Sequence, residues 1–419
     1  MKKTIIDLFE SSVEKYPSNT LLLEKTGGEF RPTTYVQARE QAIAIGAGLA
    51  ATGLKPSQAV SILAEGCNNW ILSELGIFYA GGISVPLSVK LEEKEDVLFR
   101  LRHAEVSVVM VSSSQLQKVR ALRGELPGLR LVVLFDERDT PQQDEITMAE
   151  LVARGNELLA SGRDKFLEIG HALKNDDYAT ITYTSGTTAD PKGVILTHRN
   201  YTANVEQALT CMDIPPHWRT LIILPLDHCF AHVVGFYIII ASGAAAATLQ
   251  VGRSPIETLK NIPGNIKEVR PHFLLTVPAV AKNFRKNIEG SIRAKGAVTE
   301  KLFKFALKIA YAYNKDGYSR GTGAAAALKP LVALFDKILF SKVREAFGGE
   351  LQFFVGGGAL LDSELQRFFY AIGIPMYQGY GLSEATPIIS TNAPRAHKFG
   401  TSGRLVQPLD LRIMDEQRH

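Results

Sequence analysis

The stretch "YATITYTSGTTADPKGVILTHRN", residues 178–200, places a cluster of Ser, Thr and Gly between two apolar runs. The first run, "YATITY", reads as a β-strand, so the cluster begins where a strand ends. The cluster supplies hydroxyls and unhindered backbone N–H groups, which are suited to bind phosphate oxygens. The residues concerned are Thr184, Ser185, Gly186, Thr187 and Thr188, followed by the positive charge of Lys192.

Two other interpretations of this loop must be weighed. A Walker A loop requires a lysine that follows a glycine and precedes Ser or Thr. Lys192 lies between Pro191 and Gly193, so that motif is absent. A surface loop of small polar residues is the plainer alternative, and the loop alone does not decide between the two.

Short β runs alternate with helical segments on both sides of the loop. Residues 34–53 are a typical helical segment, in which Ala42, Ile45 and Leu49 recur near helical spacing. This alternation predicts parallel sheets covered by helices. We expect strands at residues 59–65, 81–88, 106–112, 129–136, 220–226, 245–251, 273–278, 351–358 and 409–415, and a helical insertion at residues 282–315.

The composition is that of a globular protein with several lobes, since 46% of the 419 residues are hydrophobic and 21% are charged. The 47 Lys and Arg exceed the 43 Asp and Glu by too little for a nucleic-acid-binding surface. Cys67, Cys211 and Cys229 lack the spacing of a disulfide framework or a zinc site, which favours a reducing, cytoplasmic compartment.

One uncharged segment, residues 229–252, is long enough to cross a bilayer. Its Ser-Gly break and alanine run favour a buried helix followed by a turn and a strand instead. At the N-terminus, Asp7 and Glu10 interrupt the apolar run before a signal peptide could form.

Two further Gly-rich segments follow predicted strands. "YQGYGLSEA", residues 377–385, places the ring of Tyr380 near the hydroxyl of Ser383 and the carboxylate of Glu384. Such groups can stack on a purine and reach a metal held on phosphates. "FFVGGGALLD", residues 353–362, ends with three glycines, as expected where a ligand approaches the backbone closely. Three Gly-rich strand ends in one α/β chain predict one nucleotide cleft.

These motifs together resemble those of the adenylate-forming superfamily of acyl-CoA synthetases, luciferases and nonribosomal adenylation domains. "YTSGTTADPKG" resembles its phosphate-loop signature, and "GYGLSE" resembles its Gly-Tyr-Gly-Leu-Thr-Glu signature. The helical insertion after Pro278, "LPLDH" and "FSKVREAFGGELQFFVGGGALL" are similar to long-chain fatty acyl-CoA synthetases. The resemblance implies an α/β fold, the large N-terminal domain of this superfamily. That domain would have two helix-flanked, mostly parallel sheets and a smaller β-barrel-like lobe, in approximate lobes at residues 1–175, 176–360 and 361–419.

The implied activity is that of an AMP-forming ligase. A long-chain fatty acid would react with ATP to give an acyl-adenylate and pyrophosphate, and the acyl group would pass to CoA, with Mg²⁺ as cofactor. Adenylation of a medium-chain, aryl or amino acid, or a noncatalytic acyl- or nucleotide-binding protein, are the alternatives. Peripheral contact with the inner membrane surface and a homodimer are both compatible with the sequence.

The resemblance also implies residue roles on the nucleotide side. Thr184 and Glu384 would hold magnesium, and Ser383 would contact the α-phosphate. Tyr380 would stack on adenine, although a buried core tyrosine is the alternative, as a helix cap is for Glu384. The β- and γ-phosphates would be bound by Ser185, Gly186, Thr187, Thr188 and Lys192, and the adenine side would be lined by Gly357, Gly358, Ala359, Gln378, Gly379 and Gly381.

On the acyl side, His228 lies where the family has a histidine near the reacting carboxylate, and with Thr184 and Glu384 it completes the implied catalytic set. We expect it to position the substrate and not to transfer a proton. His232 lies where some long-chain members carry a tryptophan that gates the acyl tunnel. The implied acyl-binding residues are His228, His232, Val233, Gly235 and Gly357, although plain core packing also explains residues 233–247.

Relatives in this superfamily continue through a ribose-binding aspartate, a hinge and a small C-terminal lid. The chain ends shortly after "GRLVQPLDLRIMD". We therefore expect an isolated N-terminal domain, without the lid domain, that turns over poorly by itself.

Overall fold

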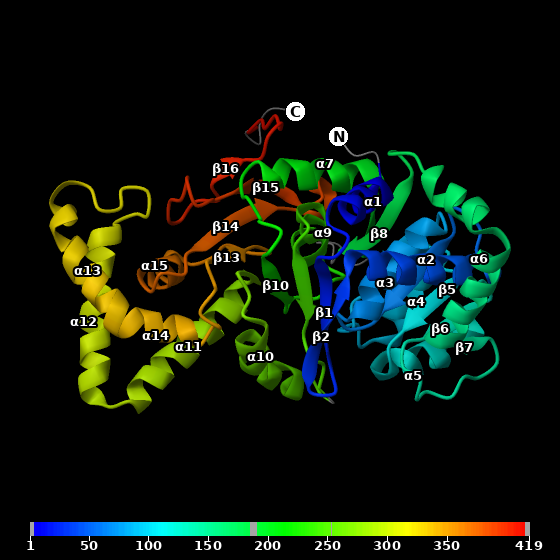
Figure 1. The fold of residues 1–419 in the computed structure, drawn as a ribbon, viewed down its shortest axis with the longest axis horizontal. Coiled ribbons are helices and arrows are strands. Elements are labelled where there is room, and N and C mark those ends of the chain that lie inside the picture. The colour runs from blue at the N-terminus through cyan, green and yellow to red at the C-terminus, as the bar shows by residue number, and fades with distance from the viewer. Residues whose placement is uncertain (1–3, 185–190, 253, 415–419) are drawn as a thin grey trace.

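The computed structural model describes residues 4–184, 191–252 and 254–414. This part of the chain forms two β-sheets with helices between them and on their outer faces (Figure 1). Both sheets are mostly parallel, as the alternation of strands and helices predicts. The expected lobe boundaries near residues 175 and 360 stay a prediction.

The first sheet has seven strands within the described residues, in the order β7-β6-β5-β3-β4-β8-β9. Only its edge strand β9 is antiparallel to its neighbour. In that pair Thr184 lies opposite Lys192, so the two ends of the phosphate-loop motif meet. The strands are β3 (Ala59–Leu63), β4 (Ile83–Pro86), β5 (Val108–Val111), β6 (Leu131–Leu134), β7 (Glu145–Thr147), β8 (Tyr178–Thr184) and β9 (Lys192–Thr197).

The second sheet has nine strands within the described residues, in the order β16-β15-β14-β13-β12-β10-β11-β1-β2. Antiparallel pairs occur only at its two ends, β1–β2 and β14–β15–β16. The strands are β1 (Thr20–Thr26), β2 (Glu29–Thr34), β10 (Arg219–Ile222), β11 (Ala245–Thr248), β12 (Phe273–Thr276), β13 (Phe353–Gly356), β14 (Met376–Gly381), β15 (Ile388–Thr391) and β16 (Arg404–Leu405).

The end of the chain differs from the sequence-based expectation. Strands β14, β15 and β16 extend the second sheet, and no closed barrel forms among the described residues. The strand predicted at residues 409–415 is wrong over its described part, because residues 409–414 have no neighbouring strand. Leu411 and Ile413 are accordingly 54% and 90% exposed.

Alternate residues of the strands pack against different helical layers, as the pleat of a strand requires. In β12, Phe273 and Leu275 face the helices between the sheets, whereas Leu274 faces the outer layer. The layer between the sheets contains α1 (Ile5–Lys15), α2 (Tyr35–Ala51), α3 (Asn68–Tyr79), α6 (Met148–His171), α7 (His198–Leu209), α8 (Cys229–His232), the π-helical turn η2 (Val233–Tyr237) and α9 (Ile238–Ser242).

The outer layers complete the fold. The first sheet is covered by α4 (Lys94–His103) and α5 (Ser113–Leu122), which precedes the short turn η1 (Arg123–Glu125). The second sheet is covered by α10 (Pro255–Val269), α11 (Pro278–Ala294), α12 (Ala297–Asn314), α14 (Ser341–Glu345) and α15 (Ser363–Ala371). Between α12 and α14 lie η3 (Gly323–Leu328), α13 (Lys329–Phe335) and η4 (Asp336–Phe340), and η5 (Ser383–Ala385) follows β14.

The uncharged segment at residues 229–252 folds as a buried helical stretch, α8 to α9, followed by a turn and strand β11, which confirms its expected structure. Within the described ranges, no helix combines the length and the hydrophobicity that a bilayer span requires. The predicted helical insertion is confirmed as α11 and α12.

Four of the helices between the sheets begin at threonine caps. The hydroxyl of each cap accepts the N–H of the third residue of the helix, whose side chain in turn accepts the N–H of the cap. These reciprocal bonds satisfy backbone donors that the helix itself leaves free. They occur at Thr4, Thr34, Thr147 and Thr197, at the starts of α1, α2, α6 and α7.

Helix α2 lies against α3 and α6 at distances that leave no room for a Cβ atom. A Cβ on Gly155 of α6 would lie 1.9 Å from the carbonyl oxygen of Ala44 on α2. A Cβ on Gly46 of α2 would lie 2.5 Å from the carbonyl oxygen of Gly76 on α3. Glycine is therefore required at these contacts, because the backbones touch directly.

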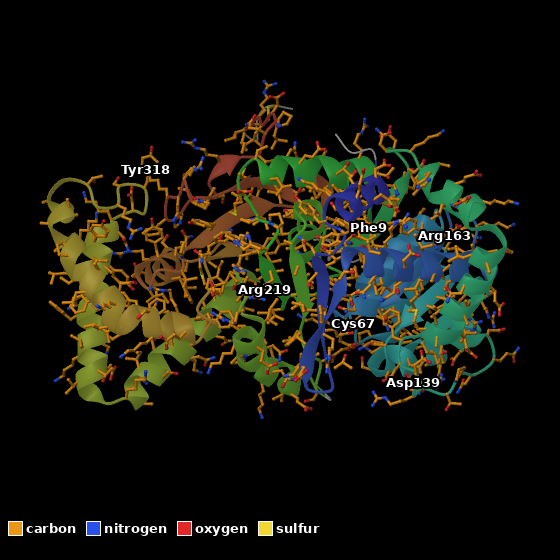
Figure 2. The ribbon with its side chains drawn as sticks, viewed as in Figure 1. Phe9, Cys67, Asp139, Arg163, Arg219 and Tyr318 are labelled. Carbon is orange, nitrogen blue, oxygen red and sulfur yellow. The ribbon has the colours of Figure 1, made fainter. Side chains whose placement is uncertain are left out.

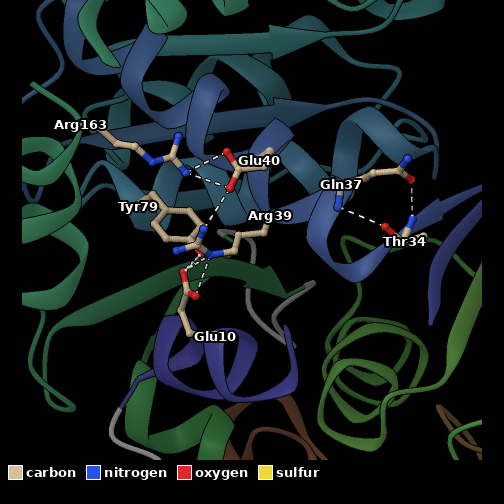
Figure 3. A network of polar contacts seen from close by, with 7 residues as sticks. All are labelled: Glu10, Thr34, Gln37, Arg39, Glu40, Tyr79 and Arg163. Atoms are coloured by element: carbon tan, nitrogen blue, oxygen red, sulfur yellow. Dashed lines mark hydrogen bonds and ion pairs between the residues drawn. The ribbon is translucent and has the colours of Figure 1, made fainter. Parts of the chain in front are cut away.

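A polar network ties the same helices together at their edge (Figure 3). Arg39 on α2 donates to both carboxylate oxygens of Glu10 on α1, at 2.9 and 2.7 Å, and to Glu40 at 2.9 Å. Arg163 on α6 donates to Glu40 at 2.8 Å, and Tyr79 on α3 donates to Glu10 at 2.5 Å. Burial, together with the Glu10 carboxylate, raises the pKa of Tyr79, so the phenol keeps its proton as a donor.

We expect Gly155→Ala to lower the free energy of unfolding by about 3 kcal/mol, because the added methyl group meets a helix backbone that must move. Urea unfolding monitored by circular dichroism measures this loss. The matched control is Gly290→Ala on α11, where a Cβ meets no atom within 4 Å. There we expect a gain of ~0.5–1 kcal/mol from helix propensity. Unchanged stability of Gly155→Ala would contradict the close approach of α2 and α6.

Candidate active site

A cleft opens at the carboxyl ends of β13 and β14. This is the edge at which open parallel sheets bind ligands. The cleft brings together residues that the sequence places more than 150 positions apart. The predicted site residues among its lining are His228, Gly357, Gly358, Gly379, Tyr380, Gly381 and Ser383.

Many of the residues that line the cleft are apolar. One apolar wall comes from the end of α7 with the segment that follows, and another from α8 to α9. The wall from α7 was not predicted, although the apolar positions at the end of that helix were a signal for it. Val234 and Ile238 lie within residues 233–247, the segment expected to offer an apolar slot. An acyl chain in this part of the cleft would gain roughly 0.8 kcal/mol for each buried methylene. The wall residues are Ala208, Leu209, Met212, Ile214, Phe230, Val234 and Ile238.

Only some side chains of the buried segment around the π-helical turn η2 reach the cleft. Val234 and Ile238 line it. Val233 is fully buried in the core between the sheets, and a Cβ on Gly235 would lie 3.3 Å from Leu275. Neither Val233 nor Gly235 lines the cleft, so their acyl-binding roles stay predictions.

His228 is the N-cap residue of α8, and its side chain is exposed at the cleft. Its Nδ1 atom accepts the backbone N–H of Phe230 at 3.2 Å. A neutral imidazole with an accepting Nδ1 carries its proton on Nε2. The ring therefore presents a hydrogen-bond donor, which suits it to hold a carboxylate or phosphate oxygen in place.

The glycine turn after β13 is shaped by its neighbours. A Cβ on Gly357 would lie 2.9 Å from the ring of Phe230, so the ring occupies the space beside that glycine. Gln378 is 3% exposed and lies behind the turn, where its Oε1 accepts the N–H of Leu361 at 2.8 Å. Its Nε2 donates to the carbonyl oxygen of Ala359 at 3.4 Å. Gln378 and Ala359 do not line the cleft, and Gln378 supports the loop that does.

Tyr380 lies at the cleft with its side chain 52% exposed. Its ring is thus available to a ligand and is not the buried core tyrosine of the alternative interpretation. A half-exposed aromatic ring next to a glycine turn is suited to stack on a purine. Stacking itself stays a prediction.

The phosphate side of the site joins both sheets. The turn η5, which carries Ser383 and Glu384, packs beside β9, whose first residue is Lys192. Lys192 and Glu384 are both exposed, and Thr184 lies opposite Lys192 in the β8–β9 pair. The other predicted phosphate ligands lie outside the described residues: Ser185, Gly186, Thr187 and Thr188.

A buried thiol lies behind this junction. The side chains of Ser383 and Thr182 contact the thiol of Cys229, and burial raises its pKa. The thiol is therefore protonated at neutral pH and is not an activated nucleophile. Its contacts fix η5 against β8 and α8.

The described residues contain no group of three or more His, Cys, Asp and Glu side chains arranged to hold a metal ion. Thr184 and Glu384 would offer one hydroxyl and one exposed carboxylate. Magnesium commonly binds through one or two carboxylates, several waters and the phosphates of a substrate. The two residues therefore fit a magnesium ion that arrives with a nucleotide.

His232 lies away from the cleft, in a buried polar cluster. Its Nε2 is 2.5 Å from Oε2 of Glu74 and 3.0 Å from the hydroxyl of Tyr237, which donates to the same carboxylate oxygen at 2.9 Å. The side chains of His232 and Glu74 are both 0% exposed. The cluster connects α3 to α8, and Glu74 was not predicted. A gating role for His232 stays a prediction.

Comparison with known proteins assigns the chain to a family. A family model described as AMP-binding enzyme matches residues 9–419. A peroxisomal long chain acyl-CoA synthetase of Arabidopsis thaliana is 28% identical over 98% of this chain and 57% of its own length. A long-chain-fatty-acid–CoA ligase of Bos taurus is 27% identical over 99% of this chain and 56% of its own. The chain thus spans little more than half the length of these relatives.

Solved structures show the same fold at low identity. A crystal structure of an anthranilate CoA ligase in complex with anthranoyl-AMP has a TM-score of 0.71 and 19% identity, over 99% of this chain and 66% of that one. The N-terminal domain of FACL13 from Mycobacterium tuberculosis has a TM-score of 0.66 and 19% identity, over 97% and 83%. The two mostly parallel sheets are therefore those of adenylate-forming N-terminal domains.

We expect Glu74→Leu to lower the free energy of unfolding by about 3 kcal/mol, because His232 and Tyr237 lose a buried acceptor. Chemical denaturation measures the loss. The double variant Glu74→Leu/His232→Leu should lose less than the sum of the two single variants, by ~0.5–3 kcal/mol, since the pair acts as a unit. Strictly additive losses would contradict a coupled pair.

Proposed function

Because the chain belongs to the AMP-binding enzyme family, we propose that it activates a long-chain fatty acid with ATP. The products would be an acyl-adenylate and pyrophosphate, and CoA would then accept the acyl group. The observation that carries this proposal is a cleft whose lining combines two kinds of residue. Apolar residues from α7 to α9 suit an acyl chain, and the glycine turns, Tyr380, His228 and Ser383 line the same cleft.

The chemical difficulty is the approach of a carboxylate to a phosphate, since both are negative. Fixed hydrogen-bond donors lower this barrier when they point to the place where charge develops. The Nε2–H of His228 would hold a carboxylate oxygen, and the hydroxyl of Ser383 would donate to the α-phosphate. Both residues line the cleft, so they could act on one reacting pair.

Lys192 and Glu384 would act on the polyphosphate end of ATP. Lys192 would pair with the β- and γ-phosphates, and Thr184 with Glu384 would hold magnesium. The ion would neutralise the charge of the departing pyrophosphate. The packing of η5 beside β9 supports this division of roles, because it brings both segments to one place.

The solvent exposure of the cleft residues affects the rate at which this chain could convert its substrates. Tyr380 is 52% exposed, and His228 and Glu384 are exposed as well. Water therefore reaches the groups that would hold the reacting atoms, and exclusion of water strengthens such electrostatic contacts. We expect this chain by itself to bind ligands but to turn over slowly.

The acyl class is tested by thermal shift with nonhydrolysable acyl-adenylate analogues. We expect the palmitoyl analogue to stabilise the chain more than the acetyl, benzoyl and aminoacyl analogues. At a hundredfold its dissociation constant, a ligand adds ~2.7 kcal/mol of stability. Val234→Phe should narrow the apolar part of the cleft and reduce the palmitoyl shift, whereas the remote control Val36→Phe should not. A larger shift with benzoyl or aminoacyl would retain the family chemistry and reject the long-chain substrate.

The phosphate roles are tested by comparing two ligands. Lys192→Met and Glu384→Gln should weaken Mg·ATP binding about tenfold or more, because each removes a charge that contacts the polyphosphate or its metal. The same variants should bind the palmitoyl-adenylate analogue normally, since it lacks the β- and γ-phosphates. Calorimetric titration measures both, with the exposed Glu14→Gln as control. Equal weakening of both ligands would contradict the assignment, and no binding of Mg·ATP by the unmodified chain would favour a noncatalytic acyl-binding protein.

A further inference from the structure

Helices α11 to α14 form an arm at the end of the molecule that lies farthest from the first sheet (Figure 1). Residues 278–345 contain 14 Lys and Arg but only 5 Asp and Glu, a net charge of +9. The whole chain carries +4, so the remainder carries −5. The positive charge of the protein is therefore concentrated on the arm, which is a cost to its own stability unless a negative partner is present.

Helix α12 shows how the arm presents this charge. Its core face is buried, and its outer face has two stripes at helical spacing. The first stripe is apolar and the second, beside it, is basic. The core face contains Phe303, Ala306, Leu307 and Ala310, the apolar stripe Val298, Leu302 and Phe305, and the basic stripe Lys301, Lys304 and Lys308.

The apolar stripe is well exposed and continues onto the next helix. Val298 is 82% exposed and Phe305 is 53% exposed. The ring of Phe305 lies 5.9 Å from that of Phe335 on α13, edge to face. On α13, Leu331 and Leu334 are 42% and 51% exposed. The two helices thus share one exposed apolar surface.

A groove between α10, α11, α12 and the η4–α14 stretch also combines apolar and basic residues. Its lining includes Ile292, Leu302 and Ile338 together with four lysines. No Asp or Glu belongs to the lining that the described residues provide. The lysines are Lys267, Lys286, Lys295 and Lys342.

Several lysines of the arm have no ion-pair partner among the described residues. In the described ranges, Lys301, Lys308 and Lys342 form no ion pair, whereas Lys304 pairs with Glu300 at 2.7 Å. Tyr318, in the loop after α12, is 67% exposed (Figure 2). Single exposed apolar residues are ordinary. A connected set of them beside unpaired lysines indicates a partner that is both apolar and anionic.

We propose that this arm binds the surface of an anionic lipid bilayer. The lysines would contact the headgroups, and the apolar surface of α12 and α13 would enter the interface between headgroups and acyl chains. The long aliphatic stems of lysine allow both contacts at once. An acidic protein would match the charge but would leave the most exposed apolar side chain of the arm, Val298, without a comparable environment. The proposal does not depend on the reaction or substrate assigned above.

The test is co-sedimentation of the 419-residue chain with vesicles. Vesicles of phosphatidylcholine alone are compared with vesicles that contain one quarter phosphatidylglycerol, at low and at 0.5 M NaCl. We expect binding to the anionic vesicles at low salt and its loss at high salt, because salt screens the headgroup attraction.

Two sets of variants locate the binding surface. Lys301→Glu/Lys308→Glu/Lys342→Glu should weaken binding on the order of 100-fold, since each basic residue near such a surface contributes roughly 1 kcal/mol, about fivefold. The control with the same change of charge is Lys55→Glu/Lys165→Glu/Lys174→Glu, three exposed lysines outside the arm, and it should retain most of the binding. Val298→Ser/Leu334→Ser should weaken binding without any change of charge, and Val36→Ser is its control.

Each outcome bears on the proposal. Loss in both arm variants with binding retained in both controls supports it, provided that circular dichroism shows the arm variants folded. Equal loss in the arm and control lysine variants would overturn it, because net charge alone would then explain binding. Equal binding to neutral and anionic vesicles would overturn it too. Binding of soluble polyglutamate without binding of vesicles would reject the bilayer in favour of an acidic protein partner.

Discussion

The helices between the two sheets touch backbone to backbone, and the candidate site depends on that contact. Gly46 of α2 meets Gly76 of α3 at a distance that excludes a side chain, so α3 has one position against α2. Two residues before that contact on α3 is Glu74, which hydrogen-bonds to His232 and so holds α8. Helix α8 then places Phe230 against the glycine turn after β13. A packing constraint deep in the first half of the protein thereby sets a wall of the cleft in the second half.

Much of the fold could be predicted from sequence because buried parallel strands are short apolar runs that alternate with helices. The β1–β2 hairpin was missed because polar residues dominate its second strand, although Gly27 and Gly28 form a two-residue turn with φ angles of 62° and 91°. The strand expected near the end of the chain is the opposite case, because it was predicted but does not form over residues 409–414. Its apolar alternation is real, but residues 409–414 have no neighbouring strand to pair with.

The candidate site also contains both residues that could be predicted from the sequence and residues that could not. The gathering of the glycine turns, Tyr380 and Ser383 at one cleft was predictable, because small residues and an aromatic ring at strand ends are typical of nucleotide sites and these motifs are local. Glu74 was not, since a glutamate in a helix usually faces solvent, and its partner lies 158 residues away. The apolar walls from α7 and α9 could not be separated from ordinary core, because both use the same residue types. Only the three-dimensional structure shows which of these apolar side chains line a cleft and which fill the core.

The π-helical turn η2 gives the apolar wall an unusual sensitivity to chain length. A π-turn accommodates one residue more than an α-turn over nearly the same rise. Deletion of one residue within 233–237 would restore a continuous α-helix of nearly the same rise and rotation, so α8 and α9 would keep their orientation and Ile238 would stay at the cleft. Only the side chains within the turn, including Val234, would change position. This part of the wall can therefore change during evolution by the loss of a single codon, without displacing the helices on either side.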